Sequence, residues 1–265
     1  MRPRRLLLIA LGLVVIAWAL VPAARGALLV RHGGSPFSAN MSGYPAEQVS
    51  FAASDGVRLN GTLVPAPAAT GTVILVHGFK SGRGEMLDWL AFLHPTYSVL
   101  LYDGRGVGSS DGVFGVGATE DRDILGAVDF IQRRRAAGWD RVAVLGISLG
   151  AGDAILAGAR DERIRAVVAD SPWIDEFVQL ERMHSLPIGP VAVPLLPYEP
   201  ALVDALLGGR LEDARLVTVV DKIAPRSLLL IHSLDDGNAT TPVGASDRLF
   251  HLAGEPKELW LVPSG

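Results

Sequence analysis

The sequence of 265 residues contains no cysteine, and this absence excludes several kinds of chemistry. No disulfide, thiolate zinc site or cysteine nucleophile can form without a sulfhydryl group. An excess of positive charge is also lacking, because 24 lysine and arginine residues stand against 28 aspartate and glutamate residues. Phosphate backbones are bound by broad patches of lysine and arginine, so we expect no nucleic-acid partner.

A long uncharged run is present near the N-terminus. Arg2, Arg4 and Arg5 precede a stretch from Leu6 to Ala24 without any charged residue. As a helix this stretch would span about 28 Å, close to the hydrocarbon thickness of a bilayer. The leading arginines favour an N-terminus held in the cytoplasm. Residues 1–26 are therefore predicted to be a membrane anchor, with the rest of the chain outside the cytoplasm.

Two other interpretations of this run remain open. Ala24-Arg25-Gly26 fits a small-x-small cleavage site, so a cleaved signal segment would give a secreted protein. A buried core helix is disfavoured, because nothing on the segment is polar enough to face water. Residues 27–46, rich in Gly, Ser, Pro and Asn from position 31 onward, are predicted to be a linker. Residues 47–265 are long enough for one large domain.

That domain alternates segments typical of strands and helices. Residues 49–53 and 57–64 bracket a Ser54-Asp55-Gly56 turn and predict a hairpin. Further strands are predicted at 72–76, 98–102, 141–145, 164–168, 228–231 and 258–262, and helices at 85–93, 119–135, 151–158 and 244–252. This alternation predicts an α/β fold with a mostly parallel sheet and helices on both faces. A Pro- and Leu-rich stretch at about 171–225 is predicted to be a cap-like insertion of one or two helices.

The motif Gly146-Ile147-Ser148-Leu149-Gly150 directly follows one of these strands and precedes a helix. Gly-x-Ser-x-Gly alone is a weak signal in a glycine-rich chain, and the strand–motif–helix context makes it specific. Such a turn lifts the hydroxyl above the sheet edge, at a helix N-terminus whose dipole favours negative charge. We predict that Ser148 is a nucleophile. The alternative is a serine with a purely structural role in the turn.

A second motif, His77-Gly78-Phe79, follows the predicted strand 72–76. Acyl transfer passes through a tetrahedral oxyanion, which needs two preorganised N–H donors. The backbone amides of Phe79 and Leu149 are the predicted donors. The His77 ring is predicted to brace the loop.

Four motifs together resemble a known superfamily. They are Val76-His77-Gly78-Phe79, the run from Tyr102 to Ser110, Gly146–Gly150, and the run from Leu230 to Asp236. In order and spacing they resemble the α/β-hydrolases, in the branch of serine aminopeptidase-like and lysophospholipase-like hydrolases, many of which have an N-terminal membrane segment. The resemblance covers about residues 49–262. It implies an eight-stranded sheet, a Ser-Asp-His triad, and hydrolysis of an ester, thioester or amide without a cofactor.

The same resemblance implies the position of the acid. The superfamily pattern Ile-His-Gly-x-x-Asp falls on Ile231 to Asp236, with Ser233 in place of the glycine, so Asp236 is the expected acid. Its neighbour Asp235 is an alternative, and Asp170 is a lesser one. Asp103 and Arg105 are expected to brace the loop that follows their strand.

The general base is the part of the triad that the sequence does not supply. In this superfamily the histidine follows the last strand, but here the predicted strand 258–262 is followed by Pro263-Ser264-Gly265, and the usual C-terminal helix is expected to be missing as well. We therefore expect a truncated copy of an ordinary hydrolase, and hydrolysis by this chain reduced by several orders of magnitude. The alternative is a natural chain without the base. Among the other histidines, only His184 in the predicted cap is not excluded by its position.

The predicted function is a serine hydrolase acting on an acyl ester. The stretch Leu186–Leu207 would suit an apolar acyl group, and ordinary core packing is the alternative for it. An aminopeptidase-type peptidase is the alternative within enzymes, which would need a pocket carboxylate such as Asp175, Glu176 or Glu181. A catalytically silent binding protein of the same fold is the alternative outside enzymes. No metal site is apparent. The expected partners are a small-molecule acyl ester or a peptide, and the membrane through the N-terminal helix.

Overall fold

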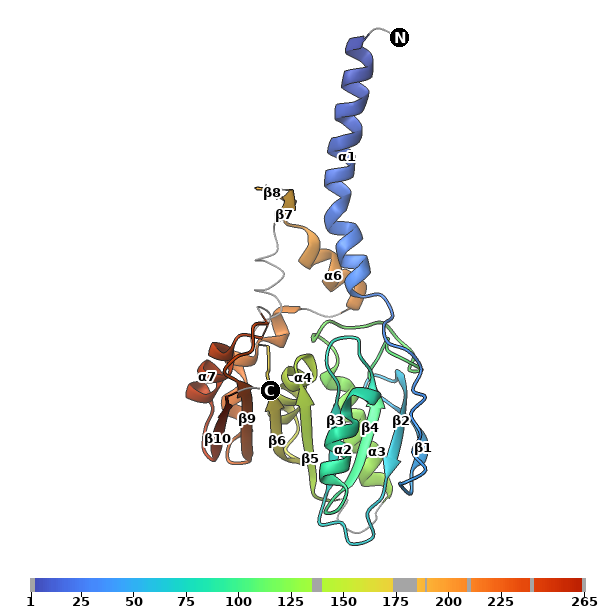
Figure 1. Cartoon of the computed structure of the whole chain (residues 1–265), viewed down its shortest axis with the longest axis vertical. Helices are drawn as coiled ribbons and strands as arrows, with labels where there is room; N and C mark the ends of the chain where they lie inside the picture. The colour runs from blue at the N-terminus through green and yellow to red at the C-terminus, as the bar shows by residue number, and fades with distance from the viewer. Residues whose placement is uncertain are drawn as a thin grey trace.

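An eight-stranded sheet in the order β1-β2-β4-β3-β5-β6-β9-β10 organises the chain (Figure 1). The structure is a computed structural model that describes residues 3–134, 140–173, 185–188, 190–208, 211–238 and 241–263. The β2 strand pairs antiparallel with both β1 and β4, and the remaining neighbours are parallel. The predicted mostly parallel sheet of eight strands is confirmed.

The strands lie within a few residues of their predicted positions, because runs of β-branched and apolar residues mark them clearly in the sequence. They are β1 (Glu47–Ala52), β2 (Arg58–Val64), β3 (Thr72–Val76), β4 (Ser98–Asp103), β5 (Val142–Ile147), β6 (Ile164–Asp170), β9 (Ser227–Ser233) and β10 (Lys257–Val262). Every residue of β3 is buried, as expected for a central parallel strand. The register pairs Val76 with Gly146 and Ile147 with Asp170, so the carboxyl ends of β3, β5 and β6 meet at one edge.

Helices cover both faces of the sheet, as predicted. One core joins α3 (Asp121–Arg134), α4 (Leu149–Arg160) and α7 (Val243–Leu252) to the sheet. A second core lies on the other face, where η1 (Arg83–Met86) and α2 (Leu87–Leu93) pack against β3 and β4. The helix predicted at 85–93 thus begins with a 3₁₀ turn and is α-helical only from Leu87.

The N-terminal helix α1 (Pro3–Leu29) rises away from the sheet (Figure 1). Its segment Arg4–Leu29 is the one helix in the described part of the chain that is long and apolar enough to cross a membrane. Residues 4–17 are all exposed, whereas residues from Trp18 onward are partly covered.

The segment predicted to be a linker packs on the domain. Gly33 forms a parallel bridge with Val107, and the ring of Phe37 lies 4.7 Å from the Arg83 guanidinium carbon. The chain therefore runs along the domain surface between α1 and β1 and does not extend freely into solvent.

In its described residues, the predicted cap contains one α-helix and a hairpin that we did not predict. Its described elements are β7 (Ser185–Ile188), β8 (Val191–Pro194), α6 (Glu199–Leu207), η2 (Leu211–Ala214), η3 (Leu216–Thr218) and η4 (Val220–Ile223). The sequence signal for the hairpin is the Gly189-Pro190 dipeptide between two short apolar runs, a typical turn marker. Residues 174–184, which include His184, Asp175, Glu176 and Glu181, lie outside the described residues.

Candidate active site

Ser148 lies in the turn between β5 and α4, at the carboxyl edge of the sheet. Its backbone has φ 53° and ψ −114°, a conformation that residues other than glycine seldom adopt. The Ser148 amide donates a hydrogen bond to the Asp170 carbonyl at 2.8 Å, which ties the turn to the end of β6. Strain of this kind persists where the surrounding structure holds it, and it is concentrated at functional sites.

The two glycines of the motif make this turn possible. A Cβ added at Gly146 would lie 2.0 Å from the Gly150 carbonyl oxygen. A Cβ added at Gly150 would lie 2.5 Å from the carbonyl oxygens of both Val76 and His77. Both neighbours are backbone atoms, which cannot rotate away, so each position requires glycine.

The loop after β3 lies directly against Ser148. A Cβ added at Gly78 would be 3.5 Å from the Ser148 Cβ. The loop is held from the other side by Glu85, whose Oε2 accepts a hydrogen bond from the Gly78 amide at 2.7 Å. The structure thus brings together the two motifs that sequence analysis singled out separately.

The amides of Phe79 and Leu149 are unpaired donors. Within the described residues, neither N–H donates to a backbone or side-chain acceptor. Leu149 is the first residue of α4, where the helix dipole adds to the attraction for negative charge. Two unpaired N–H groups beside a serine are the arrangement that an oxyanion needs.

The His77 ring has the contacts of a structural brace. Its Nε2 accepts a hydrogen bond from the Gly104 amide at 3.0 Å, so the proton is on Nδ1, which donates to the Gly78 carbonyl at 2.8 Å. Burial lowers the pKa of His77, which keeps the ring neutral. With both nitrogens occupied, the ring links the loops that follow β3 and β4.

The candidate acids cluster at the carboxyl ends of β6 and β9. Asp236 Oδ2 lies 3.3 Å from His232 Nε2, and its Oδ1 accepts a hydrogen bond from the Asn238 amide at 2.8 Å. Asp235 is exposed and accepts a hydrogen bond from the Ser233 hydroxyl. Asp170, next to the Ser148 turn, has its pKa raised by burial. Of the two acids considered for β9, Asp236 is the more enclosed, with its side chain 21% exposed.

The described histidines are engaged elsewhere. His232 is buried in β9 and its Nδ1 lies 2.8 Å from the Ser246 hydroxyl, while His94 Nε2 lies 3.1 Å from the Pro65 carbonyl oxygen. His251 contacts the Asp247 carbonyl at the far end of α7. In the described residues no hydrogen bond joins a histidine to Ser148.

Buried charges hold the loop after β4, as expected for Asp103 and Arg105. The Arg105 guanidinium pairs with Asp123 and with Asp55, at 2.7 and 2.8 Å. Asp103 Oδ1 accepts a hydrogen bond from the Arg83 amide at 3.1 Å. These contacts are structural, and they assign no chemistry to either residue.

Sequence analysis missed three residues around the site. Glu120 accepts hydrogen bonds from the amides of Gly115 and Gly117 at 2.7 and 2.9 Å. Burial and the nearby Asp123 raise the pKa of Glu120 to about 7. Trp173 donates from Nε1 to the Leu149 carbonyl at 3.1 Å, and Lys80 follows the Phe79 amide directly. Trp173 acts through a partner distant in sequence, and Glu120 and Lys80 act through their places in loops. No local motif marks such a role.

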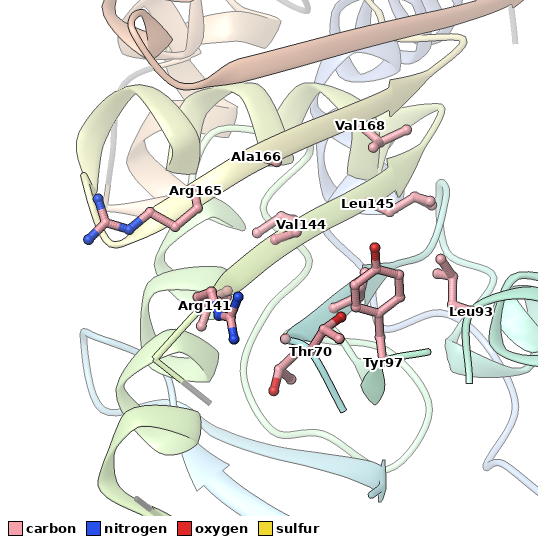
Figure 2. Close-up of a pocket in the computed structure, with 14 residues that line it drawn as sticks. Thr70, Leu93, Tyr97, Arg141, Val144, Leu145, Arg165, Ala166 and Val168 are labelled. Carbon is pink, nitrogen blue, oxygen red and sulfur yellow. The ribbon is translucent and has the colours of Figure 1, made fainter. Parts of the chain in front are cut away.

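A cavity of 420 Å³ lies away from Ser148, on the face of the sheet that carries α2 (Figure 2). Its lining comes from β3, β5 and β6, mostly from their amino-terminal parts but as far as Leu145 and Val168, with Tyr97, Arg141 and Arg165 at its margin. Because Ser148 follows the opposite ends of these strands, we do not assign the cavity to the active site. Across the described ranges, no group of three or more His, Asp or Glu side chains could hold a metal ion.

Comparisons with known proteins show what the chain is similar to. The chain is 29% identical over 232 residues to YfhR of Escherichia coli K12, which covers 84% of this chain and 73% of that protein. It is 25% identical over 193 residues to the thiohydrolase aneE of Aspergillus aculeatus, covering 70% of this chain and 59% of that protein. Its fold is similar to that of the Pyrococcus furiosus esterase Pf2001, with a TM-score of 0.66, 21% identity, and coverage of 89% and 90% of the two chains.

A family model gives the assignment. Residues 42–190, more than half of the chain, match the model of the X-Pro dipeptidyl-peptidase (S15) family. This region contains the Ser148 turn and the loop after β3. The predicted superfamily and the predicted enzyme class are confirmed: the chain is a hydrolase with the α/β-hydrolase fold and belongs to the X-Pro dipeptidyl-peptidase (S15) family.

Proposed function

We propose that this hydrolase cleaves carboxylic esters or thioesters through an acyl-enzyme on Ser148. The observation that carries the proposal is the juxtaposition of Ser148, in its strained turn, with the unpaired amides of Phe79 and Leu149. An ordinary turn serine would not need the two close glycine contacts on either side of it.

In the proposed reaction, the Ser148 oxygen attacks the substrate carbonyl while a general base takes the hydroxyl proton. The carbonyl electrons move to the oxygen, and the resulting oxyanion accepts hydrogen bonds from the Phe79 and Leu149 amides. The intermediate collapses with the proton transferred to the leaving alcohol or thiol. Water then attacks the acyl-enzyme by the same route and releases the acid. We assign Asp236 as the acid that orients the base, with Asp235 as the alternative.

Ester or thioester chemistry is our first choice, and two relatives support it. One is named an esterase and one a thiohydrolase. The family model supports the second candidate, a peptidase that recognises the amino end of its substrate, because that model is named for an X-Pro dipeptidyl-peptidase. The two candidates differ in whether a carboxylate binds the substrate amine.

The test uses the full chain in detergent micelles, with a short p-nitrophenyl ester, an acyl thioester and an X-Pro p-nitroanilide as substrates. We expect hydrolysis of the first two and labelling by a fluorophosphonate probe, both slow for this chain because no described histidine is hydrogen-bonded to Ser148. The Ser148→Ala variant should lose the labelling and bring ester hydrolysis down to the rate left by binding and the oxyanion site alone. In the same assay, Asp236→Asn should lower kcat far more than Asp235→Asn.

Ser171→Ala is the matched control, because Ser171 also has a positive φ, 52°, at the end of the neighbouring strand β6. It should retain most of the activity. Cleavage of the anilide in preference to the esters would favour the peptidase. Neither labelling nor hydrolysis of any of the three substrates would favour a silent binding protein.

A further inference from the structure

We infer that the β7–β8 hairpin is seated in the outer surface of the lipid bilayer beside α1, with the start of α6 at the membrane surface, so that the active site takes acyl esters directly from the membrane. This inference rests on the proposed function and on α1 acting as a membrane anchor. It goes further in assigning an interaction surface to the cap and a lipid acyl ester as the class of substrate.

The cap is attached to the carboxyl-terminal half of α1 (Figure 1). Trp18 Nε1 donates a hydrogen bond to the Pro194 carbonyl at 2.8 Å, and the Tyr198 hydroxyl donates to the Ala19 carbonyl. Nearly two turns beyond Trp18 along α1, Arg25 pairs with Glu199 at 3.5 Å. These contacts join β8 and the start of α6 to the part of α1 that would leave the membrane.

The positions along α1 set the depth of the hairpin. Arg25 is the first charged residue after the uncharged run, so it marks the level at which charge is tolerated. Trp18 lies seven residues earlier, about 10 Å deeper at the rise of an α-helix. The Trp18–Pro194 contact therefore places β8 inward from the Arg25–Glu199 pair, within the depth that interfacial elements reach below the headgroups.

The composition of the cap suits this position. From Ser185 to Tyr198 the sequence has no charged residue, and the first charge after it is Glu199, at the level of Arg25. Val191 in β8 is 58% exposed, so apolar surface of the hairpin faces outward. Lipid is the occupant that matches this surface, because the surface continues the exposed apolar face of a helix able to cross a membrane.

The backbone of the hairpin is also adapted to an apolar environment. Prolines at 187, 190 and 194 have no N–H group, which removes three donors that would otherwise lose their contact with water. The Pro194 carbonyl is satisfied by Trp18. Trp18 and Tyr198 are residue types that concentrate at the membrane–water interface.

The proposed active site opens toward the same side. Lys80, which directly follows Phe79, donates from Nζ to the Leu28 carbonyl at 2.9 Å, at the end of α1. The proposed oxyanion loop therefore lies at the foot of the membrane helix. The carboxyl edge of the sheet faces the bilayer, and the loop between β2 and β3 lies at the opposite edge.

The absence of cysteine allows a direct test, because a single introduced cysteine can carry an environment-sensitive fluorophore. Ala192→Cys places it on β8, and Ala68→Cys is the matched control, an exposed alanine in the loop between β2 and β3. In phosphatidylcholine vesicles, we expect the fluorophore at position 192 to be quenched by nitroxides on lipid acyl chains and protected from iodide. The fluorophore at 68 should show the reverse. Equal iodide quenching at both positions would overturn the inference.

A second experiment links the surface to the substrate. Ala192→Asp should reduce hydrolysis of a long-chain ester embedded in the vesicles by tenfold or more, because a charge resists insertion. Hydrolysis of a short soluble ester should be unchanged, and Ala68→Asp should affect neither. Loss of both activities on Ser148→Ala, with no difference between the two aspartate variants, would keep the proposed function and reject the membrane surface. Activity independent of Ser148 would reject the proposed function itself.

Discussion

Ser148 shows how much of the site is decided by single residues that have no side chain. The turn exists because Gly146 and Gly150 allow backbone atoms to approach to distances that a Cβ would block. Gly150 is the more informative of the two, since its neighbours are carbonyl oxygens of Val76 and His77, in the loop that adjoins Ser148. A change there would alter both halves of the proposed site together.

We therefore expect Gly150→Ala to reduce ester hydrolysis by about a hundredfold, the effect of displacing a catalytic group by about 1 Å. Stability should fall by about 1–3 kcal/mol, because the added methyl group overpacks the core. Steady-state kinetics and thermal unfolding measure the two effects. Gly244→Ala in α7 is the control, since a Cβ there meets no atom within 4 Å. A Gly150→Ala variant that matched Gly244→Ala in both measurements would contradict this account of the turn.

At this scale, sequence analysis could propose only those residues that a local motif defines. Ser148, Leu149 and Phe79 follow from two short patterns, and the structure places the two patterns side by side. Trp173 and Lys80 were missed because their partners are the Leu149 and Leu28 carbonyls, distant in sequence. Hydrogen bonds from a side chain to a remote backbone group have no sequence signature.

At the scale of elements, prediction succeeded where one periodic pattern defined one element. The buried strands and the helices α3, α4 and α7 lie close to their predicted positions. The β7–β8 hairpin was missed because each strand has only four residues, too few to show alternation. The predicted linker packs on the domain through Gly33 and Phe37, and its composition alone suggested a flexible segment.

The segment leading into α3 carries a pH-dependent interaction. Burial and the neighbouring Asp123 raise the pKa of Glu120 from 4.5 to about 7, and burial also raises that of Asp123 to about 6. A carboxyl with a higher pKa in the folded state binds its proton more tightly when folded. Protonated Glu120 therefore contributes its full stabilisation of the fold below pH 4.5, and this stabilisation is lost as the pH rises through about 7.

Glu120→Gln should remove the part of the pH dependence of stability that comes from Glu120. Thermal or denaturant unfolding of the full chain in detergent, at pH 5 and at pH 7.5, measures it. Between these values the wild-type chain should lose on the order of 2 kcal/mol more stability than the variant does. The glutamine side chain cannot accept all the backbone hydrogen bonds, so the variant should be less stable at both pH values, but with a flatter slope. Glu162→Gln, at an exposed position, controls for the loss of one carboxyl group. Equal slopes for wild type and Glu120→Gln would contradict the assignment.

At the scale of the whole molecule, α1 is joined to the domain at several points. Its carboxyl-terminal half contacts the cap through Trp18 and Arg25, and its last turn accepts a hydrogen bond from Lys80. Sequence analysis predicted the helix from its length and apolar character, but treated the anchor, the linker and the domain as separate units. The contacts that join the anchor, the linker and the domain form only in the tertiary structure, and the amino-acid composition of each segment does not predict them.

These contacts favour an anchor over a cleaved signal segment. The candidate cleavage site, Ala24-Arg25-Gly26, lies inside a helix that continues to Leu29. Gly26 is buried against Val203, where an added Cβ would lie 3.3 Å from the Val203 side chain, and Arg25 is paired with Glu199. A peptidase needs an accessible and extended segment, and this one is helical and covered by α6. We therefore propose that residues 1–26 remain as the anchor.

Membrane extraction and mass spectrometry of the protein from its own source test this proposal. We expect the chain to stay in the membrane pellet after a wash at high pH, and to be released only by detergent. Peptide mapping should recover the run Leu6–Ala24 from the extracted protein. Gly26→Leu would separate α1 from α6 by steric overlap with Val203, and it should increase cleavage near this position if the packing protects it. A protein released by the wash, with a new N-terminus near Gly26, would instead identify the helix as a signal segment, and the cap would then have no anchor to hold it against the bilayer.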